Sequence, residues 1–538
     1  MRAPYSRTFF DLVCEQAERY PHAAAVICED AATTYAALRN AAARIATGLR
    51  AIGVGQGERV GLLLNNCTQW LEICFGVAAL GAVAVPFSTW SKRRELDFLI
   101  KDSRIKVLIT LDRLGNQDYA KDLAELIPSI ATTVAWQSER YPLLQTVVML
   151  GDSPLAGAIA YDAFGADRAP IELPLAPGYG PRAHDPALVL YTSGSTSYPK
   201  AVPLTHAASI ENGFNIGERQ GLRPGDRVLL SPPLFWSYGS ANAMCATMTH
   251  GATLVLQGRF EPGEALDLIE RHRCTAIYTL PGMTNAMVLH ESFTPERTRS
   301  LRTGLTIGTP HDIEAAALTL GAREICNVYG QTESYGNCSV TWHHWPLQRR
   351  MQDQGPPLPG VRIRIVDEAS GAPVALGAAG LIEVKGYITP GYEGVSAQNN
   401  AAAFSADGYF RTGDLGRLTP EGNVQFVGRA SEIIKRSGIN IAPAEVEEVL
   451  RHCPGVAQAG VVGVADADKG EIVMAFVVPE PGAELSEDAL RQFCRSEAAS
   501  YKTPDHVQLC SALPTTPTGK LMRSELKQMA IKARSQAN

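Results

Sequence analysis

The chain has 538 residues, of which 45% are hydrophobic and 19% charged, and its formal net charge is −6. These proportions are ordinary for a globular protein, and the length exceeds what one core usually holds, so we expect two or more domains. The negative net charge argues against a general electrostatic attraction to nucleic acid or to an anionic membrane surface.

The longest apolar stretch, residues 73–87, contains two glycines and Pro86 and is too short to span a bilayer. We interpret it as a buried helix followed by a strand. The N-terminus lacks the charged, apolar and small-residue order of a signal peptide, and the 11 cysteines show no Cys-x-x-Cys pair or zinc-binding spacing. We therefore expect a cytoplasmic protein whose cysteines are reduced.

The first 180 residues alternate between helical and extended patterns. Thr34 is placed to cap a helix that runs to about Leu49, with Gly53 ending it. A further helix is predicted at residues 94–101, and buried strands are predicted at residues 60–64, 107–110, 227–231, 253–256 and 276–279. This alternation predicts an α/β fold with parallel sheets that helices cover on both faces, and with ligands bound where the strands end.

The pattern changes after about residue 355. Short strands separated by glycine and proline turns are predicted at residues 361–366, 380–384 and 423–427. They indicate a small antiparallel or barrel-like subdomain at about 355–428. A second change follows Gly428-Arg429, after which Pro443 suits the first turn of a helix and the chain continues as a compact α+β segment.

The most informative segment is residues 191–200, Tyr-Thr-Ser-Gly-Ser-Thr-Ser-Tyr-Pro-Lys, directly after the apolar run 187–190. A strand that opens into such a turn presents backbone N–H groups and hydroxyls on one concave side, which suits phosphate oxygens. Lys200 adds a positive charge at the end of the turn. Because the spacing differs from the common Gly-x4-Gly-Lys-Ser/Thr loop, we expect a different class of nucleotide enzyme.

Two later segments combine aromatic and acidic groups. Within residues 327–333, Asn-Val-Tyr-Gly-Gln-Thr-Glu, Tyr329 could stack on a nucleobase and Glu333 could hold Mg²⁺. Residues 409–415 place Asp414 after a glycine turn, where its carboxylate could accept both ribose hydroxyls. Taken singly, these residues are explained equally well or better as turn and capping residues.

Basic residues mark the last two segments. Arg429 is followed by Ser431, Glu432 and Lys435, and Lys520 ends a proline- and glycine-containing loop. Each of these cations, taken alone, is more simply a solvated surface side chain.

Together and in this order, the five segments resemble the motifs of the acyl-adenylate-forming superfamily. That group contains acyl- and aryl-CoA ligases, adenylation domains of peptide synthetases and firefly luciferase. The resemblance covers about residues 9–526 and is closest in pattern to the aryl-acid CoA ligases. It implies a large N-terminal domain at residues 1–430 and a smaller, mobile C-terminal domain at residues 431–538, with Ser431 at the hinge.

The resemblance also implies ATP, Mg²⁺ and coenzyme A as ligands. The residues that it assigns to ATP are Thr192, Ser193, Gly194, Ser195, Thr196, Lys200, Gly308, Thr309, Pro310, Asn327, Tyr329, Gly330, Asp414 and Arg429. Residues 192–196 would wrap the β- and γ-phosphates, Tyr329 would stack on adenine, and Asp414 with Arg429 would hold the ribose.

Four residues receive catalytic roles from the same resemblance. Thr332 would contact the α-phosphate and Glu333 the Mg²⁺. Lys520 would bridge the carboxylate and the α-phosphate in the first step. Lys435 would face the site in a second, thioester-forming orientation of the C-terminal domain.

Three positions depart from the family pattern. Ser197 and Ala201 replace glycines of the phosphate loop, so a stiffer backbone is expected there. Ser431 stands where the family usually has Asp or Lys. Serine tolerates turn geometry, so we still expect the C-terminal domain to rotate, with a different equilibrium between its two orientations.

The acid-binding pocket is expected to be built from Trp236, Tyr238, Gly239, Gly308, Tyr335 and Gly336. Trp236 and Tyr238 would form a flat aromatic wall, although the alternative is that such rings only pack the core. No acidic residue in these segments could pair with a substrate ammonium, which favours an aromatic or cyclic apolar acid over an amino acid.

Three hypotheses for function follow. The first is an ATP-dependent ligase that joins such an acid to the thiol of CoA. The second is an amide synthetase, or an enzyme that loads a separate carrier protein. The third is a nucleotide-binding regulator without catalysis, against which the intact Glu333, Asp414, Arg429 and Lys520 argue. We expect a monomer or a homodimer.

Overall fold

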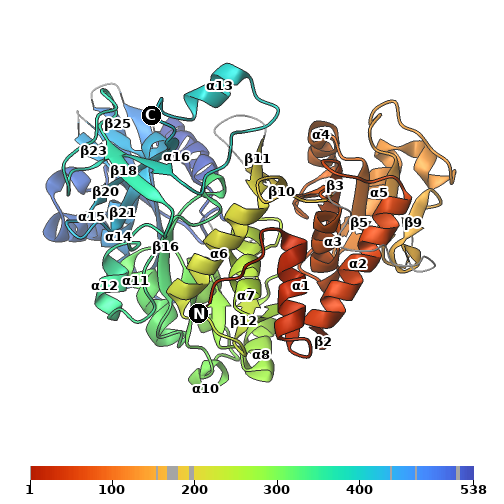
Figure 1. Cartoon of the computed structure of the whole chain (residues 1–538). Helices are drawn as coiled ribbons and strands as arrows, with labels where there is room; N and C mark the ends of the chain where they lie inside the picture. Colours follow the sequence, from red (N-terminus) through yellow and green to blue (C-terminus); the bar gives the residue numbers. More distant parts are fainter. Residues whose placement is uncertain are drawn as a thin grey trace.

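The computed structural model describes residues 2–152, 155–165, 180–192, 199–436, 439–466, 469–516 and 521–537. Two large, mostly parallel sheets are followed by a small antiparallel sheet and a compact C-terminal α+β domain (Figure 1). This arrangement confirms the fold class expected from the sequence. Within the described part of the chain, no helix is both long enough and apolar enough to cross a bilayer.

The eight-stranded sheet is parallel in its centre and antiparallel at both edges. Its strands, in spatial order, are β17 (Ser339–Val340), β16 (Cys326–Tyr329), β15 (Thr303–Thr306), β14 (Ala276–Tyr278), β12 (Arg227–Leu230), β13 (Thr253–Leu256), β1 (Ala24–Cys28) and β2 (Ala31–Thr34). β1 pairs in parallel with β13, so a strand from the start of the chain completes a sheet built mostly from residues beyond 226.

The seven-stranded sheet holds the phosphate-loop hairpin at one edge. Its strands, in spatial order, are β11 (Lys200–Thr205), β10 (Pro186–Thr192), β4 (Val83–Pro86), β3 (Arg59–Leu63), β5 (Val107–Leu111), β8 (Thr146–Leu150) and β9 (Ala158–Ala160). The parallel pair of β4 and β10 joins strands that lie about a hundred residues apart in the chain.

Helices cover both sheets, as the alternating pattern predicts. Those of the N-terminal part are α1 (Phe9–Arg19), α2 (Tyr35–Ala51), α3 (Thr68–Ala79), α4 (Arg93–Ser103), α5 (Tyr119–Leu126), α6 (His206–Gln220), α7 (Cys245–Thr249), α8 (Pro262–His272), α9 (Pro281–Val288), α10 (Pro295–Thr298), α11 (Pro310–Glu314), α12 (Leu347–Gln352) and α13 (Ala397–Ala402). Thr34 caps α2 by accepting a hydrogen bond from the Ala37 N–H, and Gly53 follows the helix with φ +82°, which confirms the predicted start and stop signals.

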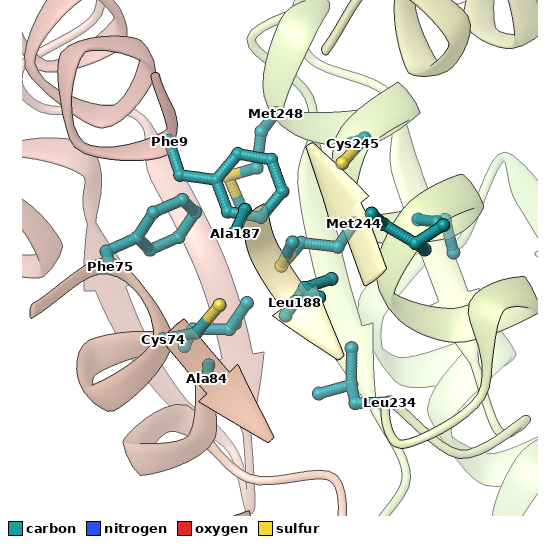
Figure 2. Packing of buried hydrophobic residues seen from close by; sticks show 14 of the residues in the cluster. Phe9, Cys74, Phe75, Ala84, Ala187, Leu188, Leu234, Met244, Cys245 and Met248 are labelled. Carbon is teal, nitrogen blue, oxygen red and sulfur yellow. The ribbon is translucent and has the colours of Figure 1, made fainter. Parts of the chain in front are cut away.

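The main core lies between the two sheets (Figure 2). Phe9 of α1 and Phe75 of α3 face Leu188 of β10 and Met244 of the π-helical segment η3 (Tyr238–Met244). The predicted helix and strand within residues 73–87 are the end of α3 and β4. Burial of this apolar surface from both sheets is the main force that holds them together.

The predicted β-rich subdomain is a four-stranded antiparallel sheet. Its strands, in spatial order, are β18 (Arg362–Val366), β19 (Gly380–Lys385), β20 (Phe410–Leu418) and β21 (Val424–Arg429). Asp414 of β20 lies directly across from Arg429 of β21 in this sheet.

The C-terminal domain has a five-stranded sheet with helices on both faces. Its elements are β22 (Ile434–Arg436), β23 (Ile439–Ile441), α14 (Pro443–Arg451), β24 (Val456–Asp466), β25 (Gly470–Pro479), α15 (Glu487–Glu497), β26 (His506–Leu509) and α16 (Arg523–Ala537). Alternate residues of β24 and β25 point to opposite faces: Val461 packs with α14 and α15, and Val462 packs with α16. The domain lies beside the β18–β21 sheet, on the opposite side of the molecule from the seven-stranded sheet (Figure 1).

Candidate active site

The carboxylate of Asp414 is the meeting point of three separate sequence segments. Its Oδ2 accepts hydrogen bonds from the Tyr329 hydroxyl at 2.8 Å and from the Gln331 side-chain amide at 2.5 Å. Its Oδ1 lies 2.9 Å from Nε of Arg429. The residue is only 2% exposed, so the fold encloses this carboxylate together with the motif that follows β16.

The Oδ1 atom of Asp414 can still accept a hydrogen bond. It is buried and, among the described residues, accepts no hydrogen bond, although the charge of Arg429 is close. Burial raises the pKa of Asp414 above its usual range, and the charge of Arg429 with the bonds from Tyr329 and Gln331 offsets this only in part. A buried acceptor without a donor is costly, so this oxygen is suited to receive a hydroxyl of a ligand.

An aromatic pair lies next to this carboxylate. The ring of Tyr329 at the end of β16 stacks on Phe426 of β21, with centroids 5.7 Å apart and planes at 25°. Tyr329 is 6% exposed and Phe426 39%. The accessible aromatic surface at this place therefore belongs mostly to Phe426, a residue outside every motif, whose only sequence signal is a strand pattern.

Tyr392 joins two predicted site residues that are far apart in sequence. Its hydroxyl donates to Glu333 Oε1 at 2.8 Å, and the ammonium of Lys200 lies 4.8 Å from the centre of its ring. Burial and the adjacent Glu333 raise the pKa of the Tyr392 hydroxyl, so it remains a donor at neutral pH. Nothing in the local sequence marks Tyr392, which lies in the loop between β19 and α13.

Glu333 provides a single buried carboxylate for a cation. One oxygen accepts the Tyr392 hydroxyl, and within the described part of the chain the second has no hydrogen-bond donor, so it is open to a ligand. In the described residues no group of three or more His, Cys, Asp or Glu side chains could hold a metal ion. The donor set therefore fits Mg²⁺ bound through one carboxylate and completed by phosphate oxygens and water, the usual arrangement for this ion with nucleotides.

The predicted phosphate loop connects the two strands of a hairpin. Thr192 ends β10 and pairs with Lys200, the first residue of β11; Ser193, Gly194, Ser195, Thr196 and Ser197 lie outside the described residues. Ala201 pairs with Tyr191 and is buried in the strand. An extended, paired residue does not need the conformational freedom of glycine, which explains how alanine is accommodated here.

The segment 308–310 forms the cap of α11. Gly308 has φ +141°, and Thr309 and Asp312 form a capping box in which Asp312 Oδ2 accepts from the Thr309 N–H and hydroxyl, both at 2.8 Å. Pro310 is the first residue of the helix. The segment follows β15, neighbour of β16, so it lies at the same end of the sheet as Tyr329.

Two other residues assigned to ATP have internal roles. The Asn327 amide donates to the carbonyls of Arg350 and Asp353 and is buried. Gly330 is required by packing, since a Cβ there would lie 2.4 Å from the Gly336 carbonyl oxygen. Both N–H groups of the Asn327 side-chain amide are therefore already used, and they are not available to a nucleotide.

Thr332 lies beside the segment assigned to the acid pocket. Its hydroxyl shares a 3.0 Å hydrogen bond with Ser237. Trp236 packs edge-on against Trp90 and Phe235, whereas the Tyr238 ring contacts Tyr278. The two pocket aromatics thus have different neighbours, and the flat wall expected from Trp236 and Tyr238 is replaced by two separate aromatic groups.

The Tyr238 hydroxyl donates to the carbonyls of Thr279 and Leu305, at the ends of β14 and β15. Tyr335 is buried in the core, with its hydroxyl bonded to the backbone N–H and the hydroxyl of Thr205. Any part that Tyr335 takes in the pocket is therefore limited to its backbone.

Glycines allow the pocket segments to approach each other closely. A Cβ at Gly239 would lie 2.2 Å from the Pro233 carbonyl oxygen. Gly336 has φ +88°, and a Cβ there would lie 2.5 Å from the Asn242 amide. Replacing either glycine would push η3 away from its neighbours.

The remaining predicted residues belong to the C-terminal domain. Ser431 is exposed in a short 3-10 turn, Ala430–Glu432. Lys435 is exposed on β22, and its backbone N–H donates to Glu471. Lys520 lies outside the described residues.

Family models match most of the chain. Residues 13–393 match the model described as AMP-binding enzyme, and residues 445–520 match the AMP-binding enzyme C-terminal domain. Feruloyl-CoA synthase from Amycolatopsis sp. is 33% identical over 95% of this chain and 97% of its own. The mitochondrial medium-chain acyl-CoA ligase ACSF2 of Rattus norvegicus is 28% identical over 97% of this chain and 87% of its own.

Solved structures share the fold over nearly the whole length. The crystal structure of the anthranilate CoA ligase AuaEII in complex with anthranoyl-AMP matches this chain with a TM-score of 0.86, with 25% identity and 99% of both chains covered. ATP-bound MatB from Rhodopseudomonas palustris has a TM-score of 0.82, with 25% identity over 97% of this chain and 98% of its own.

Proposed function

The chain belongs to the AMP-binding enzyme family, and we propose that it activates a carboxylic acid with ATP and transfers the acyl group to coenzyme A. In the first step the acid attacks the α-phosphorus, which gives an acyl adenylate and pyrophosphate. In the second, the CoA thiol attacks the acyl carbonyl and AMP leaves.

The observation that carries this proposal is the environment of Asp414. A buried carboxylate, one oxygen of which is ion-paired with Arg429 but accepts no hydrogen bond from the described residues, lies next to an aromatic pair and suits a ribose whose base lies against the rings. The neighbouring motif supplies Glu333 and Thr332, so the phosphates of the same nucleotide would extend toward Lys200.

The chemistry requires that two anions meet. Bound Mg²⁺, with Glu333 as a ligand, would supply positive charge at the phosphates. Lys200, held over Tyr392, places a fixed cation on the same side. Lys520 is proposed to bridge the substrate carboxylate and the α-phosphate, where a preorganised cation stabilises the developing charge.

A rotating C-terminal domain is part of the proposal. The boundary is placed between residues 430 and 431, with Ser431 in an exposed turn that can change its backbone conformation at little cost. Lys435, exposed on β22, would face the site after rotation, when Lys520 is withdrawn. Such an exchange lets one site carry out both half-reactions.

We propose an aromatic or cyclic acid as the substrate, in a cytoplasmic enzyme. Support comes from the aromatic groups around Trp236 and Tyr238 and from relatives whose names specify feruloyl and anthranilate substrates. The name of ACSF2 specifies medium-chain acyl groups, so an aliphatic acid is the second candidate. An amine or a carrier-bound thiol is the alternative acceptor.

The experiment is a panel of aromatic, cyclic and medium-chain acids incubated with the full chain, ATP and Mg²⁺. Acid-dependent pyrophosphate exchange measures the first step, and acyl-CoA with stoichiometric AMP measures the second. We expect both, with an aromatic or cyclic acid giving the highest kcat/KM. Product formed only with an amine or a carrier protein would reject CoA as the acceptor, and absence of exchange with every acid would reject the enzyme activity itself.

A further inference from the structure

Trp90 is an aromatic residue held in a fixed position beside the proposed reacting centre. It follows β4 of the seven-stranded sheet, whereas Phe235 and Trp236 follow β12 of the eight-stranded sheet. Its ring centroid lies 5.2 Å from each of theirs, with interplanar angles of 86° and 89°. The three rings therefore link the two sheets where the strands β4 and β12 end.

The turn that carries Trp90 is tied down on several sides. The Trp90 N–H donates to the Ser88 hydroxyl at 3.2 Å, and the Ser91 N–H donates to the Ser88 carbonyl at 3.1 Å. The Thr89 carbonyl accepts a buried hydrogen bond from the Tyr119 hydroxyl at 2.7 Å. A partly exposed indole on such a constrained turn has little freedom to move away from its neighbours.

The rings are arranged in order of depth from the solvent. Trp90 is 36% exposed, Trp236 is partly buried, and Phe235 is buried. The next residue after Trp236 is Ser237, which bonds to the Thr332 hydroxyl. Trp90 is thus the most exposed of the three rings, and Trp236 directly precedes the serine that bonds to Thr332, the proposed contact of the α-phosphate.

We propose that Trp90 is a positioning residue that, with Trp236, shields the acyl adenylate from water on the solvent side. This inference rests on the proposed function. In the reaction that the shield suppresses, a water oxygen attacks the acyl carbonyl carbon and the bond from that carbon to the phosphate oxygen breaks. AMP leaves, a proton goes to solvent, and the free acid is regenerated, so ATP is consumed without product.

The test measures AMP released by the full chain with acid, ATP and Mg²⁺ in the absence of CoA. The wild-type chain should form about one adenylate per site and then release AMP slowly. Trp90→Ala removes both edge-to-face ring pairs and should speed this release by roughly two- to tenfold. Trp90→Phe should restore most of the shielding, and the KM values for acid and ATP should change little, because the ring covers the site and does not bind either substrate.

Trp345→Ala is the matched control, since Trp345 is a partly buried tryptophan that stacks under Arg349 and, among the described residues, has no ring contact with Trp90, Phe235 or Trp236. It should leave AMP release unchanged. An unchanged release in Trp90→Ala, or a raised KM for the acid without faster release, would overturn the shielding role. If the wild-type chain shows no acid-dependent adenylate formation, the proposed function fails and this inference fails with it.

Discussion

Arg451 Nη1 lies 3.4 Å from Asp312 Oδ2, which joins the C-terminal domain to α11 and so to the segment 308–310 that is assigned to ATP. Asp312 is buried and also holds the Thr309 N–H and hydroxyl, so one carboxylate serves both the capping box of α11 and an ion pair with α14. The orientation of the C-terminal domain is thereby coupled to the position of residues 308–310.

Arg451→Ala should selectively slow one half-reaction, the one carried out in the orientation seen here. A partly exposed ion pair contributes about 1 kcal/mol or less, so the expected change is roughly two- to fivefold. Pyrophosphate exchange and thioester formation from a supplied acyl adenylate separate the two steps. Asp312→Asn combined with Arg451→Ala should be non-additive; equal slowing of both half-reactions by Arg451→Ala would contradict a role in orientation.

Asp414→Asn should weaken ATP binding without lowering stability at neutral pH. Loss of hydrogen bonds to a charged group predicts a KM for ATP higher by about 10- to 100-fold. Burial raises the folded-state pKa of Asp414 above that of the unfolded chain. The stability that this shift contributes is therefore fully present below the unfolded-state pKa and is lost as the pH rises through the folded-state pKa. At neutral pH the buried carboxylate is ionised and lowers the free energy of unfolding. The neutral side chain of Asn removes this penalty.

Two measurements check the predictions for Asp414→Asn: urea unfolding at neutral pH, and ATP affinity across the acidic pH range. In the wild-type chain, ATP affinity should fall as the pH drops through the raised pKa of Asp414, because the protonated acid accepts ribose hydroxyls poorly. Asp414→Asn should lack that part of the pH dependence. A variant that unfolds more easily at neutral pH would show that burial does not penalise this charge.

Tyr392→Phe should separate the two contacts of Tyr392. It removes the hydrogen bond to Glu333 but keeps the ring under Lys200, so pyrophosphate exchange should fall by about three- to tenfold. Tyr392→Ala should reduce it further, since a cation–π contact contributes about 0.5–2 kcal/mol. Tyr387→Phe is a matched control: this tyrosine also donates to a glutamate, Glu211, and removal of its hydroxyl should leave exchange unchanged.

Lys520→Ala and Lys435→Ala should have opposite effects on the half-reactions. Loss of Lys520 should reduce adenylate formation on the order of a hundredfold or more but spare thioester formation from a supplied acyl adenylate. Lys435→Ala should show the reverse. If either variant lost both steps equally, the two-orientation proposal would have to be abandoned.

Much of the architecture could be predicted because it is encoded locally. The Thr34 cap, the strand at 107–110 and the helix that begins at Pro443 follow from side-chain periodicity and turn chemistry, which depend on neighbours in sequence. Strand order could not be predicted in this way. Pairing of β1 with β13, and of β4 with β10, depends on which apolar faces bury each other across long separations.

The family resemblance and the acidic and basic groups of the site can be identified from the amino-acid order alone, because each motif is a short segment with its own chemistry. The residues that complete the site are set by the fold. Tyr392, Phe426, Trp90 and Arg451 belong to no motif, and they reach the site through sheet order and domain contact. The same packing sets Tyr335 in the core and leaves Asp414 Oδ1 without a hydrogen bond from any described residue, since burial and hydrogen-bond satisfaction are properties of the folded chain and not of any segment.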